Sequence, residues 1–304
     1  MTAVGVIVNP AAGGGRQVHH VGRRVRELLH DVGLTVTDLS APTLAQATDG
    51  ARAAATAGLA GLVVVGGDGA VHLGVNVTAG TSLPLGIVPA GTGNDIAHAL
   101  DIPKDPDRAV ADIVRALSTR PRTLDAVRVG RPDGVPYEWY IGVLSCGFDA
   151  AVNATANTFT WPQGHARYLR AIATELPRFR PYGYRVRMDD ETWESSGTLV
   201  TVANTPWFGG RLKIAPEADP EDGLLDVVVA GPFSRTGVTR IFPTLYKGTH
   251  VSHPQVHVFR STAVTIEPVA GLGPHPPVAF GDGERIGPLP LRVEVVPGAL
   301  TVLH

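Results

Sequence analysis

The chain has 304 residues, 44% of them hydrophobic, which is enough for about two domains with separate cores. Its formal net charge of −2 gives no reason to expect a nucleic-acid partner. The single cysteine excludes a disulfide framework and a cysteine-based zinc site. Because no run approaches the ~20 apolar residues of a membrane span and no signal peptide is recognisable, a soluble cytoplasmic protein is expected.

Short apolar strands alternate with helical patterns up to about residue 120. Strands are predicted over residues 4–8, 34–39, 62–65 and 85–88, and helices over 18–29, 44–57 and 109–117. Such alternation is typical of a parallel sheet with helices on both faces. We therefore expect residues 1–122 to form a Rossmann-like α/β nucleotide-binding domain.

From residue 124 onwards the pattern becomes mainly β. Strands are predicted over 124–129, 137–143, 184–188, 197–203, 225–230, 255–260, 263–266, 291–296 and 299–303, with one helical insert over 165–176. Turn signals such as the Pro297-Gly298 pair separate these segments. Residues 123–304 are therefore expected to form a C-terminal antiparallel β-sandwich domain.

Three predicted strands of the first domain end in glycine-rich or turn-like loops, at Asn9–Gly15, Gly66–Gly69 and Pro89–Asn94. Ligands of open α/β sheets bind beyond the carboxyl ends of the strands. Glycines there let backbone N–H groups approach phosphate oxygens, and Arg16 adds positive charge. Any one loop could be an ordinary tight turn, but three at one sheet edge favour a nucleotide site.

The familiar nucleotide motifs are absent from the sequence. Gly-Lys never occurs, so there is no Walker P-loop, and Gly66–Gly69 does not extend to the GxGxxG spacing of a dinucleotide site. Neither DFG nor HRD marks a protein kinase. The nucleotide chemistry therefore belongs to another class.

A set of motifs along nearly the whole chain resembles the bacterial diacylglycerol kinase family, whose catalytic part is shared with sphingosine and ceramide kinases. These motifs are Asn9-Pro10 with the glycines after it, Gly66–Gly69, Gly91–Asp95, Gly147–Asp149, Asn204 with Gly209-Gly210, Ala215-Pro216 leading to Asp222-Gly223, and Asp282–Glu284. GGDG alone is shared with NAD kinases. GGDG followed by GTGND is far more specific.

The resemblance implies ATP- and Mg²⁺-dependent phosphorylation of a lipid hydroxyl, with diacylglycerol as the favoured acceptor and phosphatidic acid as product. By this analogy Asp68 acts through Mg²⁺, since a bare carboxylate would repel phosphate. The alternative for Asp68 is a turn residue or helix cap. The implied nucleotide-site residues are Asn9, Pro10, Gly13, Arg16, Thr43, Gly66, Gly67, Asp68, Gly69, Thr92 and Asn94.

Two further sites follow from the same resemblance. Glu284 is the expected general base that takes the proton of the attacking hydroxyl, although Asp-Gly-Glu alone could be a polar hairpin turn. A structural Mg²⁺ is expected on the carboxylate of Asp222, with backbone carbonyls of Asp219 and Leu224. The alternative for this segment is an acidic solvent loop.

The sequence departs from the family pattern after GGDG. Ala70 stands where Thr or Ser is usual, and His72-Leu73 stand where an Asn-Glu pair is common. These departures keep two alternatives open: an NAD kinase-like enzyme for a soluble substrate, against which the missing pair counts, and a non-catalytic nucleotide- or lipid-binding member.

The lipid has to reach the site from a membrane surface, because no span is predicted. Residues 167–188 interleave arginines with aromatic residues, a composition that suits an anionic bilayer. Arginines lying over an ordinary helix and strand are the alternative. The expected location is the cytoplasm, peripheral at the inner membrane face, and a homodimer is compatible with the resemblance.

Overall fold

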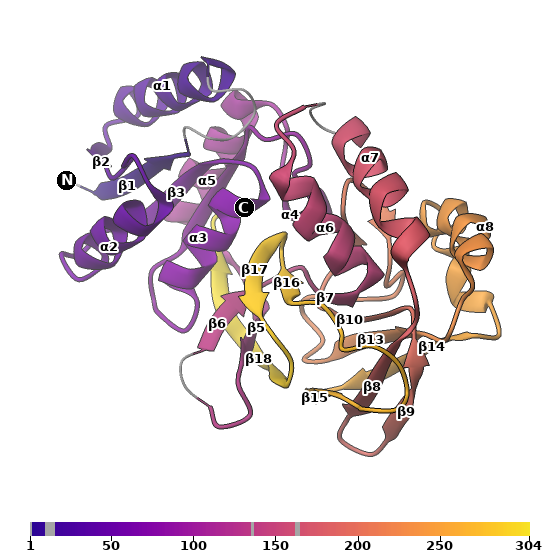
Figure 1. The fold of residues 1–304 in the computed structure, drawn as a ribbon. Coiled ribbons are helices and arrows are strands. Elements are labelled where there is room, and N and C mark those ends of the chain that lie inside the picture. The colour runs from indigo at the N-terminus through magenta and orange to yellow at the C-terminus, as the bar shows by residue number, and fades with distance from the viewer. Residues whose placement is uncertain (1, 10–15, 135–136, 162–164) are drawn as a thin grey trace. The chain divides into compact units, whose positions relative to one another are not determined.

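The computed structural model describes residues 2–9, 16–134, 137–161 and 165–304 (Figure 1). The chain divides into two compact units, Met1–Ala126 with Pro297–His304, and Val127–Val296. The expected division was 1–122 and 123–304. The structure differs from it because the last residues of the chain return to the first unit.

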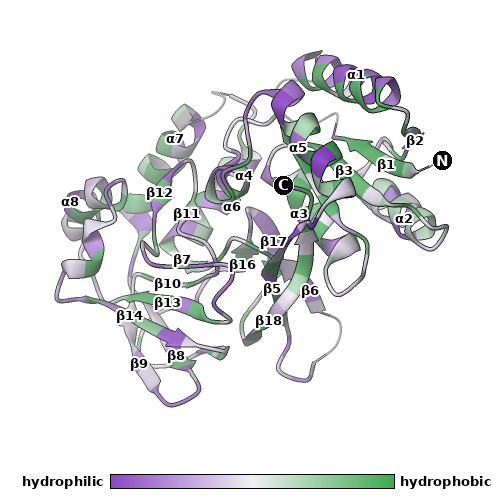
Figure 2. Ribbon diagram, turned by 180° about the vertical axis from the view of Figure 1, so that it is seen from behind, coloured by the Kyte–Doolittle hydropathy of each residue, from purple (hydrophilic) through white to green (hydrophobic). Residues whose placement is uncertain are grey.

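The first unit is built on a parallel sheet with the order β2-β1-β3-β4. Its strands are β1 (Ala3–Val8), β2 (Thr35–Asp38), β3 (Gly61–Gly66) and β4 (Leu85–Pro89). Figure 2 shows β1 and β3 as hydrophobic along most of their length. Strands buried on both faces have this composition, so the predicted α/β fold is confirmed.

Helices cover both faces of this sheet. They are α1 (Arg16–Asp31), α2 (Leu44–Ala55), α3 (Asp68–Thr78), α4 (Asp95–Ala99) and α5 (Pro106–Ser118). Alternate residues of β1 and β3 pack against α1 and α5 in one core cluster. Helices α2 and α3 pack against each other, and they contact β1 and β3 respectively. This alternation follows from the two-residue period of a strand.

The second unit contains two sheets. One is six-stranded and antiparallel, in the order β14-β13-β10-β7-β16-β17. Its strands are β7 (Val143–Gly147), β10 (Leu199–Ala203), β13 (Leu225–Ala230), β14 (Val256–Ser261), β16 (Ala279–Gly281) and β17 (Glu284–Gly287). The other is part of the ten-stranded sheet that also contains β2-β1-β3-β4: its order continues β4-β18-β15-β8-β9, with β5 paired to β18 and β6 paired to β5. Its strands are β5 (Arg122–Gly130), β6 (Tyr137–Tyr140), β8 (Tyr182–Arg187), β9 (Thr192–Gly197), β15 (Ala263–Pro268) and β18 (Leu291–Val302).

A core cluster that draws on both sheets, with Tyr140, Cys146, Tyr184 and Val293 fully buried, makes this unit sandwich-like, as predicted. A second cluster joins the six-stranded sheet to three helices, α6 (Phe148–Thr158), α7 (His165–Glu175) and α8 (Arg235–Leu245). The hairpin β11 (Trp207–Phe208) and β12 (Leu212–Lys213) adjoins them, with the short 3₁₀ helices η1 (Leu176–Arg178) and η2 (Thr249–Ser252).

Several elements differ from the sequence prediction. Two helices of the second unit, α6 and α8, were not predicted, because α6 contains several Asn, Asp and Thr residues, which favour helices weakly, and α8 carries Pro243 inside it. The segments expected as two strands around Pro297-Gly298 form the single long strand β18. Helix α3 was given no range in the sequence prediction, since glycine and valine are poor helix formers and only tertiary burial favours them here.

Candidate functional site

The loops that follow β3 and β4 pack backbone against backbone. A Cβ placed on Gly91 would stand 2.4 Å from the Cα of Gly67. The Ala90 amide donates to the Gly66 carbonyl at 2.8 Å. Two of the three glycine-rich loops predicted to share one sheet edge therefore meet there. Gly69 lies next to them, in the first turn of α3.

Asn94 holds the second loop in shape. Its backbone is left-handed, with φ 56° and ψ 43°, a conformation that Asn tolerates better than most residues. Its side-chain oxygen accepts from the Gly91 amide at 3.0 Å, and its Nδ2 donates to the Gly91 carbonyl at 2.9 Å. The contact of Asn94 with a nucleotide stays a prediction, whereas its two hydrogen bonds to Gly91 show its role in the loop.

Two carboxylates lie beside this loop. The Oδ1 atom of Asp68 accepts a hydrogen bond from the Ile96 amide at 3.1 Å, in the first turn of α4. A Cβ on Gly93 would stand 3.0 Å from Asp68 Oδ2 and 3.9 Å from Asp95 Oδ2. Neighbouring carboxylates repel each other unless a cation or proton lies between them. Because Mg²⁺ in nucleotide sites uses one or two carboxylates together with phosphate oxygens, this pair fits that ion.

Sequence reasoning singled out Asp68 but not Asp95. The available signal was its place at the end of GTGND, where it begins α4. Asp95 is only 8% exposed, which is unusual for a carboxylate and marks a position with specific surroundings.

The remaining predicted nucleotide residues lie at separate places in the first unit. Asn9 follows β1 and donates its amide to the Val65 carbonyl at 3.1 Å, which places it beside the end of β3. Thr43 is the N-cap of α2, and its hydroxyl accepts from the Gln46 amide at 3.3 Å. Thr92 is exposed in the loop after β4. Pro10 and Gly13 lie outside the described residues, as does the side chain of Arg16, whose backbone begins α1.

In the second unit, the turn that carries Glu284 is fixed by Asp282. The Asp282 carboxylate accepts hydrogen bonds from the amides of Ile141, Gly142 and Val143 at 3.0, 2.8 and 3.2 Å. Charge-assisted bonds of this kind are about twice as strong as neutral ones. Glu284 begins β17 and is half-buried, so its carboxylate is held near a fixed position while still reaching solvent.

The predicted Mg²⁺ loop is already internally paired. The Asp222 carboxylate accepts from the Leu224 amide at 2.9 Å and forms an ion pair with Arg260. Asp219 accepts from the Glu221 amide at 3.0 Å. Within the described residues there is no group of three His, Cys, Asp or Glu side chains that could hold a metal ion.

Arg260 occupies the cationic position next to Asp222, and its Nε atom lies 3.8 Å from buried Asp226. Burial raises the pKa of Asp226 to about 6, although Arg260 acts in the opposite direction. This arrangement does not present a free carboxylate to Mg²⁺. The assignment of Asp219, Asp222 and Leu224 to a metal stays a prediction.

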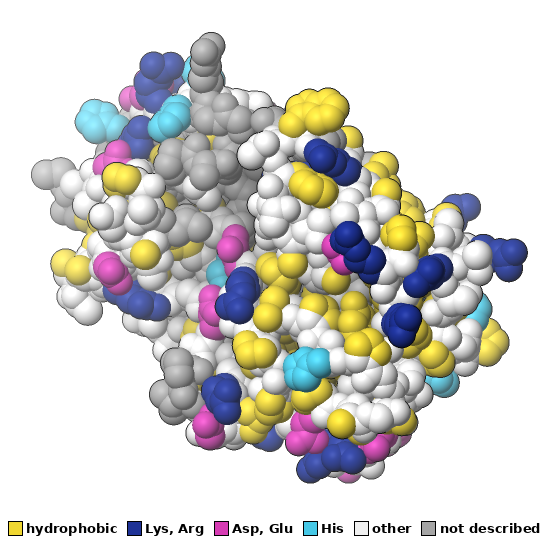
Figure 3. Space-filling view, viewed as in Figure 1, with side chains coloured by type: hydrophobic (Ala, Val, Ile, Leu, Met, Phe, Trp, Pro, Cys, Tyr) yellow, Lys and Arg dark blue, Asp and Glu magenta, His cyan; other side chains and the backbone are white. Residues whose placement is uncertain are grey.

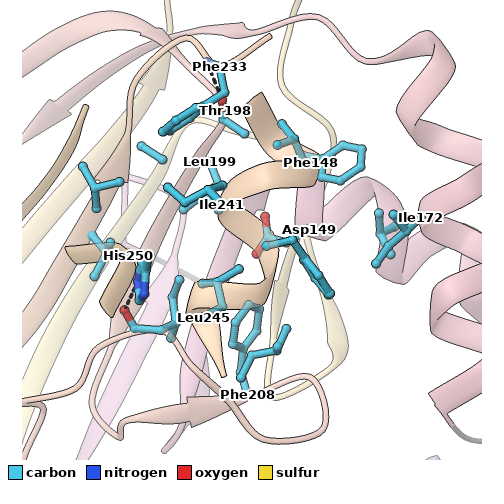
Figure 4. Close-up of a pocket in the computed structure, with 18 of the residues that line it drawn as sticks. Phe148, Asp149, Ile172, Thr198, Leu199, Phe208, Phe233, Ile241, Leu245 and His250 are labelled. Carbon is cyan, nitrogen blue, oxygen red and sulfur yellow. Dashed lines mark hydrogen bonds between the residues drawn. The ribbon is translucent and has the colours of Figure 1, made fainter. Parts of the chain in front are cut away.

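An apolar cavity lies between the six-stranded sheet and helices α6, α7 and α8 (Figure 4). Fifteen of its nineteen lining residues have hydrocarbon or aromatic side chains without a polar group. The cavity has a volume of about 60 Å³, several times the ~10–15 Å³ that one water molecule needs. Sequence reasoning missed this cavity, although the wholly apolar end of β13 signals cover on both faces.

Two family models match the chain in succession. The diacylglycerol kinase catalytic domain matches residues 3–129, and the YegS C-terminal NAD kinase beta sandwich-like domain matches residues 142–304. The diacylglycerol kinase of Mycobacterium tuberculosis (strain ATCC 25618 / H37Rv) is 38% identical over 302 residues, covering 99% of this chain and 94% of that protein. The chain belongs to the family of diacylglycerol kinases and YegS-like lipid kinases.

The chain is also similar to a more distant relative and to a solved structure. A Stenotrophomonas maltophilia (strain K279a) protein named "Probable lipid kinase YegS-like" is 30% identical, over 78% of this chain and 76% of that protein. The crystal structure of a diacylglycerol kinase from Bacillus anthracis str. Sterne matches with a TM-score of 0.71 at 17% identity. The match covers 100% of this chain and 96% of the Bacillus anthracis chain, so the two share one fold.

No helix within the described ranges of this family member has the length and apolar character needed to cross a bilayer.

Proposed function

We propose that the protein is an ATP- and Mg²⁺-dependent kinase that transfers the γ-phosphate to a lipid hydroxyl, with diacylglycerol as an acceptor and phosphatidic acid as the product. The observation that carries the lipid part is the apolar cavity beside α6, α7 and α8. Such a surface suits a hydrocarbon chain, because burying apolar area is the main source of affinity for it. The name of the Mycobacterium tuberculosis relative supports diacylglycerol.

The loops of the first unit support the nucleotide part. Gly67 and Gly91 bring the two loops together at the carboxyl end of the parallel sheet, the edge at which open α/β sheets bind their ligands. Asp68 and Asp95 would hold Mg²⁺. When bound, this ion would neutralise the phosphate oxygens and so lower the repulsion that opposes nucleophilic attack.

Glu284 would act as the general base. Its carboxylate takes the proton of the acceptor hydroxyl as that oxygen forms its bond to the γ-phosphorus, while the bond from phosphorus to the ADP oxygen breaks. The proton then passes from Glu284 to solvent. The three backbone amides on Asp282 support this role, since they fix the turn in which Glu284 lies.

An exposed surface around α7 suits contact with a membrane. The side chains of Trp161 and Leu169 are exposed, at 74% and 46%. The guanidinium of Arg170 lies over the Phe159 ring at 4.2 Å and donates to the Trp161 carbonyl at 2.5 Å. Figure 3 shows Lys and Arg side chains among hydrophobic ones on this side of the unit. We infer that this surface meets anionic lipid.

The departures from the family pattern lie inside the first unit. Ala70, His72 and Leu73 are all buried in α3, with exposures of 1%, 6% and 5%. Their side chains therefore contribute to packing, and nothing in this helix favours a soluble acceptor such as NAD.

The test is transfer of label from γ-labelled ATP, with Mg²⁺, to diacylglycerol, monoacylglycerol, sphingosine, ceramide and NAD. We expect label in a lipid. Glu284→Gln should lower the turnover about a hundred-fold or more, whereas Glu191→Gln, an exposed acid between β8 and β9, should leave it unchanged. Label in NAD, or undiminished turnover of Glu284→Gln, would overturn the proposal.

A further inference from the structure

Four residues lining the apolar cavity carry polar side-chain groups, Asp149, Tyr168, Thr198 and His250. The Thr198 hydroxyl forms two hydrogen bonds inside the protein. It donates to the Gly231 carbonyl at 2.8 Å. It accepts from the Phe233 amide at 3.0 Å, a bond marked in Figure 4. It therefore offers nothing to a ligand. Asp149 and His250 differ from it.

Asp149 is a buried carboxylate in apolar surroundings. It lies in the first turn of α6, is 7% exposed, and points into the space enclosed by the cavity side chains (Figure 4). Neither carboxylate oxygen forms a well-aligned hydrogen bond within the described residues. Burial raises its pKa to about 6, although the Ala150 amide and the Ser145 hydroxyl act in the opposite direction. A buried acceptor in this state is costly, so a partner from outside the chain would stabilise it.

His250 also presents an acceptor. Its Nε2 atom is 3.0 Å from the Ile214 carbonyl, which can only accept, so Nε2 carries the proton. Burial lowers the pKa of His250, which keeps the ring neutral and leaves Nδ1 unprotonated. That buried Nδ1 has no hydrogen-bond partner within the described residues. A ligand that satisfies these groups must therefore bring hydrogen-bond donors.

Helix α6 links this polar part of the cavity to the turn of the proposed base. Asn153 lies four residues beyond Asp149, about one helical turn and about 6 Å along the axis. Its Nδ2 donates to the carbonyl of Gly283 at 3.2 Å, in the turn that carries Glu284. A lipid whose hydrocarbon chain fills the cavity would therefore place the polar atoms that adjoin this chain at Asp149. Asp149 lies on the same helix as Asn153, which contacts the turn of Glu284.

We propose that Asp149 is a specificity-determining residue that accepts a hydrogen bond from a second donor on a single-chain acceptor lipid. This inference rests on the proposed function. Diacylglycerol has one free hydroxyl, the one to be phosphorylated, and so brings no second donor to Asp149. A monoacylglycerol or a long-chain amino alcohol has a further donor beside its one chain. The protein is thus expected to prefer such acceptors over diacylglycerol.

Binding without ATP tests the inference separately from catalysis. The probes are the decyl monoether of glycerol, which has two free hydroxyls, and the same compound methylated at its central hydroxyl. The wild-type chain should bind the first about ten-fold more tightly in calorimetric titrations, as expected for one hydrogen bond to a charged group. Asp149→Leu should remove this preference. Leu245→Ala, which shortens another lining side chain, should weaken both probes equally and keep the ratio.

The outcomes separate the two proposals. Equal affinity of the wild-type chain for both probes would overturn the inference even if lipids are phosphorylated, and so would an undiminished preference in Asp149→Leu. Should Asp149→Leu fail to fold, Asp149→Asn replaces it, with a reduced preference expected. A binding preference without phosphoryl transfer to any lipid would retain the role of Asp149 in the cavity and reject the kinase.

Decylamine distinguishes an ammonium donor from a hydroxyl. Tighter binding above pH ~6 than below it, absent in Asp149→Asn, would assign the favoured donor as an ammonium, because only the ionised carboxylate attracts a cation. Decylamine binding that is equally tight above and below pH ~6 would indicate that the favoured donor is a hydroxyl.

Discussion

Gly91 leaves no room for a side chain against Gly67: its Cβ would lie 2.4 Å from the Gly67 Cα and 2.9 Å from the Gly67 nitrogen. Both contacts are with backbone, which cannot rotate away as a flexible side chain can. The requirement for glycine at this position is therefore steric, and it concerns the approach of two loops from neighbouring strands.

Gly91→Ala should push these loops apart. We expect a loss of about 1–3 kcal/mol in the free energy of unfolding, as for other overpacked sites, and weaker ATP binding. Urea denaturation and nucleotide titration check this. Gly50→Ala is the matched control, since the helical Gly50 has open space around its Cβ position and alanine favours helices. Equal stability of the two variants would contradict the steric argument.

Gly93→Ala should affect the carboxylates rather than the fold. Its methyl group would stand 3.0 Å from Asp68 Oδ2, so the carboxylate has to shift while Oδ1 remains hydrogen-bonded to Ile96. We expect activity to fall by about ten-fold or more, with a higher Mg²⁺ concentration needed for half-maximal rate. Activity titrated against Mg²⁺ measures this, and an unchanged Mg²⁺ dependence would remove Asp68 from the ion site.

Asp282→Ala should cost stability and activity together. It leaves the amides of Ile141, Gly142 and Val143 without their carboxylate, a loss of about 2–4 kcal/mol in the free energy of unfolding. Asp282→Asn should be milder, because Asn keeps one acceptor oxygen and tolerates the left-handed backbone at φ 53°. Glu284→Gln, in contrast, should lose activity at nearly full stability. Chemical denaturation beside the kinase assay separates these patterns.

Asp149 should make stability depend on pH. Burial raises its pKa to about 6, so the folded protein holds this proton more tightly than the unfolded chain. The resulting stabilisation is complete below pH ~4 and is lost as the pH rises through about 6. Asp149→Asn cannot ionise, and relative to wild type it should gain up to about 3 kcal/mol between pH ~4 and pH ~8. Urea unfolding across this range tests it, with exposed Asp190→Asn as control. A difference that does not change with pH would refute the prediction.

The strands and loops that depend on a local residue pattern could be predicted from the sequence. Strands such as β1 and β3 are short apolar runs, and the loops after β3 and β4 are marked by glycines, so the sheet edge with Gly67 and Gly91 could be expected. The capping role of Thr43 could not, because it depends on where α2 begins. Neither could the cavity, since its lining comes from segments far apart in the chain that only tertiary packing brings together.

The ion pair of Asp222 with Arg260 could not be predicted from the sequence either. The acidic loop was apparent in the sequence, but its guanidinium partner lies in β14, 38 residues further on. Sequence spacing gave no reason to connect the two. The left-handed turn at Asp282 was likewise visible only as a polar tripeptide, whereas its three amide partners come from the segment that leads into β7.

Residues 297–304 add an edge to the sheet of the first unit, through the pairing of Val302 with Leu85 and the hydrogen bond from the Leu303 amide to the Leu85 carbonyl. A ribosome synthesises these residues only after the whole of Val127–Val296. During translation the first unit therefore lacks the partner strand of β4 until the other unit has been synthesised. Folding of this chain cannot run strictly from the first half to the second.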